Sequence, residues 1–201
     1  HTAYRRQRQM CIRDRDEMGM FRIYEDSDPT YILMLKGNAD GMELAGRMGA
    51  SQLRNLLYAY KERMDKNRFI QNLLLDNLLL VDIYNQAKKM KIPAEIKRVV
   101  FVIEPKNEGD ILVQETLKGL YATGMKDFVT AIDEKHIILV KSLQSTDDYP
   151  QVEQIAKELV TTLNMEAMVS VRAAYGTIVE ELKDVSRSYK EADMALEVGR
   201  V

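Results

Sequence analysis

Three carboxylates in the second half of the chain have the residue types that phosphoryl-transfer chemistry uses. Glu104 follows a β-branched run, and Asp133 and Glu134 lie in a short connection between two further β-prone runs. Acids at a strand end and in a nearby hairpin can hold divalent cations that polarise a phosphate. Pro105 directly follows Glu104, however, and residues 131–136 contain no glycine that would let the backbone approach a nucleotide. We therefore predict that these acids are solvated and that the chain is not an enzyme.

No other catalytic, metal-binding or cofactor-binding site is predicted. Cys11 is the single cysteine and His1 and His136 are the only histidines, so the sequence offers no Cys/His cluster for zinc. No serine or cysteine is spaced from His136 to suggest a nucleophilic triad. Gly176 lacks the companion glycines of a phosphate-binding loop. We interpret His136 as a half-buried strand residue and Gly176 as a turn.

The elements that would position these residues alternate between strand and helix patterns. The continuous apolar run at 99–103 predicts a central strand that is buried on both faces. The resulting order is that of a ferredoxin-like α+β domain, β-α-β-β-α-β-α, for which we expect one sheet with helices on one face. The strands are predicted at 99–103, 128–132, 137–143 and 169–174, and the helices begin near Asp110, Asp148 and Glu180.

Two long helical patterns, 42–64 and 67–90, precede this domain, and residues 65–67 between them allow either a bend or a break. The leucine-rich stretches of the second pattern are too apolar all round for a solitary surface helix. They indicate either a core helix shared between two domains or an interface between two copies of the chain. For the second alternative, a homodimer, the predicted dimerisation residues are Leu53, Leu56, Tyr60, Ile70, Leu74 and Leu78.

The first 41 residues contain two dissimilar parts. Residues 1–15 carry five arginines and one aspartate without periodicity. Their composition resembles translated adapter DNA, and we predict a non-native tail outside the fold, the alternative being a basic arm that binds phosphates. In residues 16–41, the β-prone runs 21–24 and 31–35 predict a hairpin or two neighbouring strands, which we interpret as the remnant of an α/β sensor domain.

Length and composition set the broad class. With 201 residues and 46% apolar content, the chain can bury the core of one or two domains. No apolar run reaches the roughly 18 residues of a membrane span, and no signal-peptide pattern is present. The sequence therefore predicts a cytoplasmic protein without membrane contact.

Two stretches resemble the CdaR/PucR family of bacterial transcription regulators. The segment from Arg68 to Ile92 resembles the helix that precedes the GGDEF-like domain of that family. The second stretch resembles its strand, glycine turn and Ser-Tyr-x-Glu-Ala helix, and its family-motif residues are Gly176, Ser188, Tyr189, Glu191 and Ala192.

The resemblance implies a degenerate, non-catalytic GGDEF-like domain at 97–201, which follows the linking and dimerisation helices at 42–92. Active diguanylate cyclases carry a Gly-Gly-Asp/Glu-Glu-Phe hairpin, whereas residues 131–136 read Ala-Ile-Asp-Glu-Lys-His. The resemblance also implies a small-molecule effector, control of sugar-diacid or purine catabolism, and DNA binding only through a C-terminal helix-turn-helix beyond Val201.

Three functions follow as hypotheses. The leading one is the signal-transmitting fragment of a ligand-responsive transcription regulator. The second is a divergent nucleotidyl cyclase that uses Glu104, Asp133 and Glu134. The third is a stand-alone dimerisation or ligand-binding module.

Overall fold

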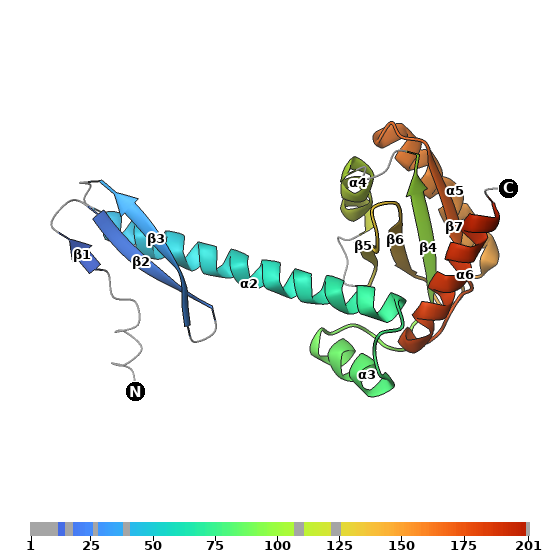
Figure 1. Cartoon of the computed structure of the whole chain (residues 1–201), viewed down its shortest axis with the longest axis horizontal. Coiled ribbons are helices and arrows are strands. Elements are labelled where there is room, and N and C mark those ends of the chain that lie inside the picture. Colours follow the sequence, from blue (N-terminus) through green and yellow to red (C-terminus); the bar gives the residue numbers. More distant parts are fainter. Residues whose placement is uncertain are drawn as a thin grey trace. The chain divides into compact units, whose positions relative to one another are not determined.

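The computed structural model describes residues 12–14, 18–25, 28–37, 41–106, 111–121 and 126–199 (Figure 1). The chain forms two compact units, His1–Asp65 and Lys66–Val201. Helix α2 (Met42–Leu74) begins in the first unit and ends in the second. None of the described helices combines the length and the apolar content that a membrane crossing requires.

The first unit contains an antiparallel sheet in the order β1-β2-β3, formed by β1 (Ile12–Asp14), β2 (Met18–Glu25) and β3 (Asp28–Lys36). The β2–β3 pair confirms the hairpin predicted from the runs 21–24 and 31–35, and its assignment to a sensor domain stays a prediction. Residues 12–14 of the predicted tail form β1, in which Ile12 pairs with Met20, and the non-native origin of residues 1–15 stays a prediction. The edge of β2 that does not face β3 has backbone N–H and C=O groups that β3 leaves free, so it can pair with a short strand whatever the side chains of that strand. The other residues of the predicted tail lie outside the described ranges.

Glycine allows the first half of α2 to lie directly on this hairpin. Phe21 and Ile23 of β2 are buried. A Cβ atom added to Gly46 would lie 2.0 Å from the Phe21 ring, and one added to Gly49 would lie 3.1 Å from Leu33. Because Phe21 and Leu33 are cross-strand partners, one face of the hairpin meets the two glycines.

The second unit confirms the α+β, ferredoxin-like order β-α-β-β-α-β-α. Its four strands form an antiparallel sheet in the order β5-β6-β4-β7, with β4 in the interior. The elements are β4 (Arg98–Pro105), α4 (Ile111–Tyr121), β5 (Phe128–Ala131), β6 (Ile137–Ser142), α5 (Tyr149–Glu166), β7 (Val171–Tyr175), the short 3-10 helix η1 (Leu182–Asp184) and α6 (Val185–Val198).

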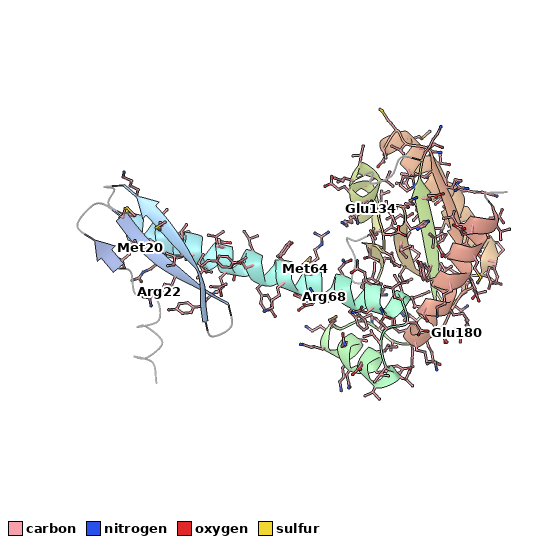
Figure 2. All side chains as sticks on the ribbon, in the orientation of Figure 1. Met20, Arg22, Met64, Arg68, Glu134 and Glu180 are labelled. Atoms are coloured by element: carbon pink, nitrogen blue, oxygen red, sulfur yellow. The ribbon has the colours of Figure 1, made fainter. Side chains whose placement is uncertain are left out.

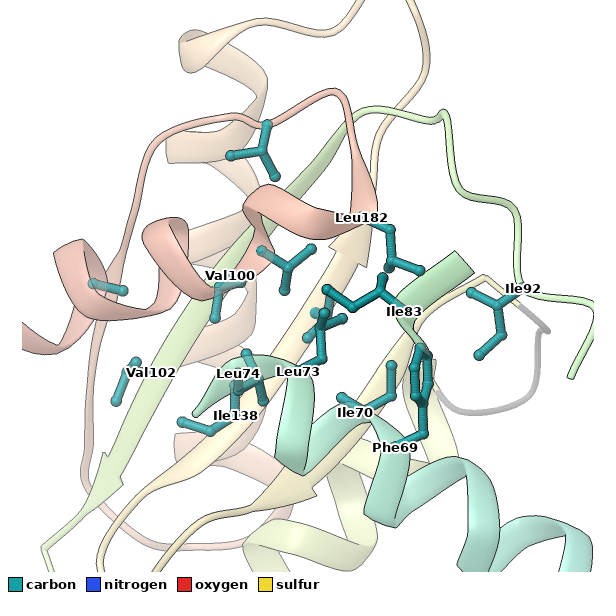
Figure 3. Close-up of a cluster of buried hydrophobic side chains, with 14 of the residues drawn as sticks. Phe69, Ile70, Leu73, Leu74, Ile83, Ile92, Val100, Val102, Ile138 and Leu182 are labelled. Carbon is teal, nitrogen blue, oxygen red and sulfur yellow. The ribbon is translucent and has the colours of Figure 1, made fainter. Parts of the chain in front are cut away.

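Helices cover both faces of this sheet, and the expectation of helices on one face is therefore wrong. Val99, Phe101 and Ile103 of β4 pack in one hydrophobic cluster with α4 and α5. Val100 and Val102 pack in a second cluster with α6, α3 (Leu80–Lys89) and the end of α2 (Figure 3). A strand that is apolar at every position requires cover on both sides, and α2 and α3 supply part of the second cover.

The helical pattern at 67–90 forms parts of two helices. Helix α2 continues unbroken through residues 65–67 and ends at Leu74, and α3 begins at Leu80. Asp76 has a φ of 61°, and the Asn77 N–H donates to the Asn72 carbonyl at 2.9 Å. This is the backbone pattern of a Schellman cap. The leucine periodicity continues across the cap and hides it in the sequence.

A second cap of the same kind ends α3. Lys91 has a φ of 57°, and the Ile92 N–H donates to the Ala87 carbonyl at 2.8 Å. The side chains of Ile92 and Ala87 are both buried in the cluster on this face. Non-glycine residues in the left-handed conformation therefore lie on both sides of α3.

Some local start and stop signals are confirmed, whereas the helix predicted to begin near Glu180 begins at Val185, after the 3-10 helix η1. Asp148 caps α5 in a capping box with Gln151, as the sequence predicts. Helix α6 ends at the predicted Gly199. The predicted N-cap Asp110 lies outside the described residues.

We predict that substitution of Leu74 will destabilise the second unit, whereas substitution of Leu56 on the same helix will not. Leu74 has 0% of its surface exposed and Leu56 has 65%. Leu74→Ala should lower the free energy of unfolding by about 2–5 kcal/mol, and Leu56→Ala should change it by about 0.5 kcal/mol or less. Urea titration followed by circular dichroism measures both, and equal effects would contradict the burial of Leu74.

Candidate functional site

Glu104, the first of the candidate metal-binding acids, lies near the end of β4 and is ion-paired across the sheet. Its carboxylate contacts the guanidinium of Arg172, which is its cross-strand partner on β7. The Glu104 side chain is largely buried, whereas that of Arg172 is half exposed. The carboxylate therefore already has a cationic partner within the sheet.

Asp133 holds together the connection between β5 and β6. One carboxylate oxygen, Oδ1, accepts the backbone N–H groups of Lys135 at 2.8 Å and His136 at 2.6 Å. The other, Oδ2, lies 2.8 Å from His136 Nδ1. Partial burial raises the pKa of Asp133, but these hydrogen bonds and the nearby His136 outweigh it, and the net pKa lies below its usual value. Asp133 thus acts as an ionised acceptor that fixes the turn.

The remaining acid, Glu134, is exposed on the same connection (Figure 2). Across the described ranges, no three His, Cys, Asp or Glu side chains come together in a group that could hold a metal ion. The fold therefore brings Glu104 and the β5–β6 connection to the same end of the sheet, but it does not assemble the three acids into one cluster.

His136 lies directly before β6 and is mostly buried, close to its predicted role as a half-buried strand residue. Its Nδ1 atom faces Asp133, and its buried Nε2 atom has no hydrogen-bond partner among the described residues. The buried Thr130 hydroxyl on β5 is likewise without a partner there. Among the described residues, no serine hydroxyl is found hydrogen-bonded to this imidazole.

The family-motif residues meet at one place, which we call the β7–α6 junction. Gly176 continues the pairing of β7, because its N–H donates to the Val100 carbonyl at 3.0 Å. The Val100 N–H in turn donates to Ser188 Oγ on α6 at 3.1 Å. A Cβ atom on Gly176 would lie 1.9 Å from the Ser188 carbonyl oxygen. Glycine is therefore required for α6 to approach the end of β7.

Glu191 and Ala192 complete the junction. Glu191 Oε2 accepts both the backbone N–H of Thr177 at 2.9 Å and its hydroxyl at 2.5 Å. The hydrogen bond from the Thr177 side chain is the main cause of the lowered pKa of Glu191. Ala192 is fully buried against the sheet. The motif thus holds α6 against the sheet in three ways: close backbone approach at Gly176, side-chain to backbone hydrogen bonds of Ser188 and Glu191, and apolar packing of Ala192.

Tyr189 is the motif residue whose pKa is raised. Its ring packs against the same hydrophobic cluster, and burial, followed by the charges of Asp193 and Asp133, raises its pKa to about 12. The phenol therefore stays protonated at physiological pH. Its position places it close to the β5–β6 connection that Asp133 holds.

Sequence reasoning missed the partners of these residues. The missed partners are Arg172, which pairs with Glu104, and Thr177, which donates to Glu191. A third is Gln71, whose Nε2 donates to the Ala131 carbonyl at 2.7 Å. The contacts of Gln71 and Arg172 join positions 60 and 68 residues apart in the sequence. Only the alternating pattern of β7 could have placed Arg172 on a sheet face, and nothing local identified its partner.

The predicted dimerisation residues fall into two groups. Ile70 and Leu74 are buried in the core of the second unit and Leu78 packs partly against it, so their own chain already covers them. These three residues therefore belong to the core of the second unit, and their role in dimerisation stays a prediction. Leu53, Leu56 and Tyr60 are exposed on α2, and their role in dimerisation stays a prediction.

Comparisons with known proteins bear on the second unit. Residues 77–198 match the family model described as "GGDEF-like domain". A solved structure described as "A Novel Interaction Mode between a Microbial GGDEF Domain and the Bis-(3, 5)-cyclic di-GMP" aligns with a TM-score of 0.44 and 14% sequence identity, over 67% of this chain and 86% of that one. No curated protein matches the chain.

We predict opposite effects of alanine at two glycines of the second unit. Gly176→Ala should lower the free energy of unfolding by about 2–3 kcal/mol, because the new methyl group would overlap the backbone of Ser188. Gly119→Ala on α4, where no atom lies within 4 Å of the new Cβ, should raise it by about 0.5–1 kcal/mol. Urea denaturation compares them, and a neutral Gly176→Ala would show that the approach of α6 does not depend on glycine.

Proposed function

Because the chain belongs to the family of GGDEF-like domains, we propose that it is the regulatory, non-catalytic part of a ligand-responsive transcription regulator. In this function α2 carries the state of the first unit into the GGDEF-like domain. The observation that supports it is that one unbroken helix of 33 residues packs on β2 at its start and enters a hydrophobic core at its end. Such a helix is about 50 Å long.

The end of α2 is fastened to the parts of the domain that could respond. Gln71 donates to the Ala131 carbonyl at the end of β5, directly before the β5–β6 connection. Just beyond the helix, Asp76 Oδ2 pairs with Lys190 Nζ of α6 at 2.9 Å. Displacement of α2 would therefore act on the hairpin and on α6 together. From α6 we propose that the signal continues to a C-terminal DNA-binding domain, in the cytoplasm.

The arrangement of the acids supports a non-catalytic domain. Glu104 is paired with Arg172 and Asp133 holds its own turn, so metal binding by both would require these contacts to break. The connection between β5 and β6 also lacks the glycines that allow close approach to a nucleotide. The divergent nucleotidyl cyclase is the second candidate function, because Glu104 and this connection do lie at the same end of the sheet.

A homodimer is part of the proposed function. Leu53, Leu56 and Tyr60 leave apolar surface exposed on α2, and a second copy could cover it. The effector would be a small molecule that acts on the first unit. The third hypothesis, a stand-alone dimerisation module, would need this helix surface but no coupling along α2.

We predict that a change in the first unit will reach the second through α2. Gly46→Val should push the helix away from Phe21 and alter hydrogen exchange of the backbone amides in residues 69–74 and in α6. Insertion of Gly-Ser-Gly-Ser after Met64 should remove this effect, whereas a seven-residue helical insertion, which adds about two turns, should preserve it. Unchanged exchange in Gly46→Val would leave the proposed coupling without support.

We further predict that the chain makes no cyclic nucleotide or cyclic dinucleotide product. Incubation with GTP or ATP and Mg²⁺, followed by chromatography, should return only the substrate. Product that disappears in Glu104→Ala and persists in the control Glu166→Ala, which removes an exposed acid of α5, would instead assign a catalytic role to Glu104 and favour the cyclase.

A further inference from the structure

Two buried polar atoms on the hairpin formed by β5 and β6 have no hydrogen-bond partner among the described residues. They are the hydroxyl oxygen Oγ1 of Thr130 and the Nε2 atom of His136. Thr130 is only 1% exposed, and 13% of the His136 side chain is exposed. A buried polar atom without a partner costs free energy, and native structures contain few of them. Two on one hairpin therefore indicate a common partner that the described residues do not supply.

Both residues lie on the same face of this hairpin. Thr130 is the cross-strand partner of Ile138, and His136 precedes Ile138 by two residues, so the alternation of side chains brings all three to one face. Ile138 packs in the hydrophobic cluster that α6 and the end of α2 cover (Figure 3). Ile132, two residues after Thr130, packs against the same cluster. Thr130 and His136 are thus diagonal neighbours, whose Cβ atoms lie roughly 7 Å apart or less.

The Asp133 carboxylate determines which nitrogen of the imidazole carries the proton. The pKa of Asp133 lies below its usual value, so the carboxylate is ionised and only accepts hydrogen bonds. His136 Nδ1, which lies 2.8 Å from Asp133 Oδ2, must therefore be the donor. In the neutral ring Nε2 is then an acceptor, whereas the Thr130 hydroxyl can donate or accept. A partner that satisfies both atoms must be able to donate to a nitrogen and to bond to a hydroxyl.

We propose that Thr130 and His136 form a buried polar site that binds a single water molecule. The water donates to His136 Nε2 and bonds to Thr130 Oγ1. Two hydrogen bonds of about 2.8 Å each span a separation that one direct bond cannot. The apolar side chains of the cluster, among them Ile70 and Leu74, would leave an ion without compensating charge, so the ligand is neutral. Water that satisfies buried polar groups in this way is a regular part of a folded protein.

Gln71 of α2 offers this water a third partner. Its Nε2 donates to the carbonyl of Ala131, the residue that follows Thr130, at 2.7 Å, so the amide lies beside this strand of the hairpin. The amide also has a second N–H group and an Oε1 acceptor, and buried waters make about three hydrogen bonds on average. The water therefore joins α2, β5 and the connection that Asp133 holds. The site goes beyond the proposed function and does not depend on it, because it concerns the cohesion of the second unit alone.

The first test observes the imidazole and the water by NMR spectroscopy of the full chain, at a pH above the usual titration range of histidine. His1 is the only other histidine, and the variant His136→Gln assigns the signals of His136. We expect the tautomer that is protonated at Nδ1, with Nε2 accepting a hydrogen bond, and a nuclear Overhauser contact between the Thr130 methyl group and a long-lived water. A ring protonated at Nε2, or a Thr130 methyl group without such a contact, would overturn the proposal.

The second test removes the Thr130 hydroxyl and keeps the shape of the side chain. Thr130→Val should raise the equilibrium constant of unfolding about tenfold in urea titrations, because the water loses a partner. The matched control is Thr161→Val on α5, where the exposed hydroxyl donates to the Lys157 carbonyl, and it should change the constant less than about threefold. A Thr130→Val chain that is as stable as the unmodified chain, or more stable, would show that the hydroxyl has no partner and would overturn the site.

A double-mutant cycle asks whether the two residues share one partner. In a chain that carries His136→Leu, the effect of Thr130→Val on the unfolding constant should be at least about threefold smaller than in the unmodified chain, because groups that bond to the same water are coupled. The contact of His136 with Asp133 is lost on both sides of this comparison and cancels. Equal effects of Thr130→Val in the two chains would contradict a water shared by Thr130 and His136.

Discussion

The five residues Val99–Ile103 in the middle of β4 have no solvent-exposed surface, and the arrangement of the second unit follows from this burial. Their backbone groups bond to β6 on one side and, from Phe101 onward, to β7 on the other. Their side chains alternate between two hydrophobic clusters. Such a strand needs a hydrogen-bonded neighbour strand at each edge and packed side chains on each face. Separate parts of the chain must supply all four.

The helices of the ferredoxin-like domain cover one face of the sheet completely and the other only in part. Helices α4 and α5 fill one face, while α6 covers only part of the other. The end of α2 and the helix α3 complete the second face, with Phe69 and Leu73 among the buried residues (Figure 3). The helix that precedes the domain is thus part of its folded core. The motif residues Gly176, Ser188 and Glu191 have a structural role for the same reason, since they hold α6 on the second face of the sheet at the β7–α6 junction.

Local patterns in the sequence predicted the elements of this fold well, and non-local contacts account for what they missed. The apolar run at 99–103 and the cap at Asp148 depend on neighbouring residues, so the sequence displays them directly. The end of α2 at Leu74 was missed because leucines continue at helical spacing beyond it. Glu104 could be placed at a strand end, but its partner Arg172 depends on strand register, which no local signal specifies. Thr177 was missed for the same reason, because its role appears only when α6 folds back onto β7.

The two caps around α3 have a consequence for how the second unit opens. Asp76 and Lys91 both hold a left-handed backbone, a conformation that costs a non-glycine residue roughly 1 kcal/mol or more. Releasing the segment between them relieves strain at both of its ends, uncovers the buried Ile83 and Ala87 together with the partly buried Leu78 and Met90, and breaks the hydrogen bond from Tyr84 to Glu181. The buried apolar surface lost in this way is small compared with the surface lost when a strand leaves the sheet. We therefore expect this segment to open before any strand does, although its opening would uncover part of the second face of the sheet.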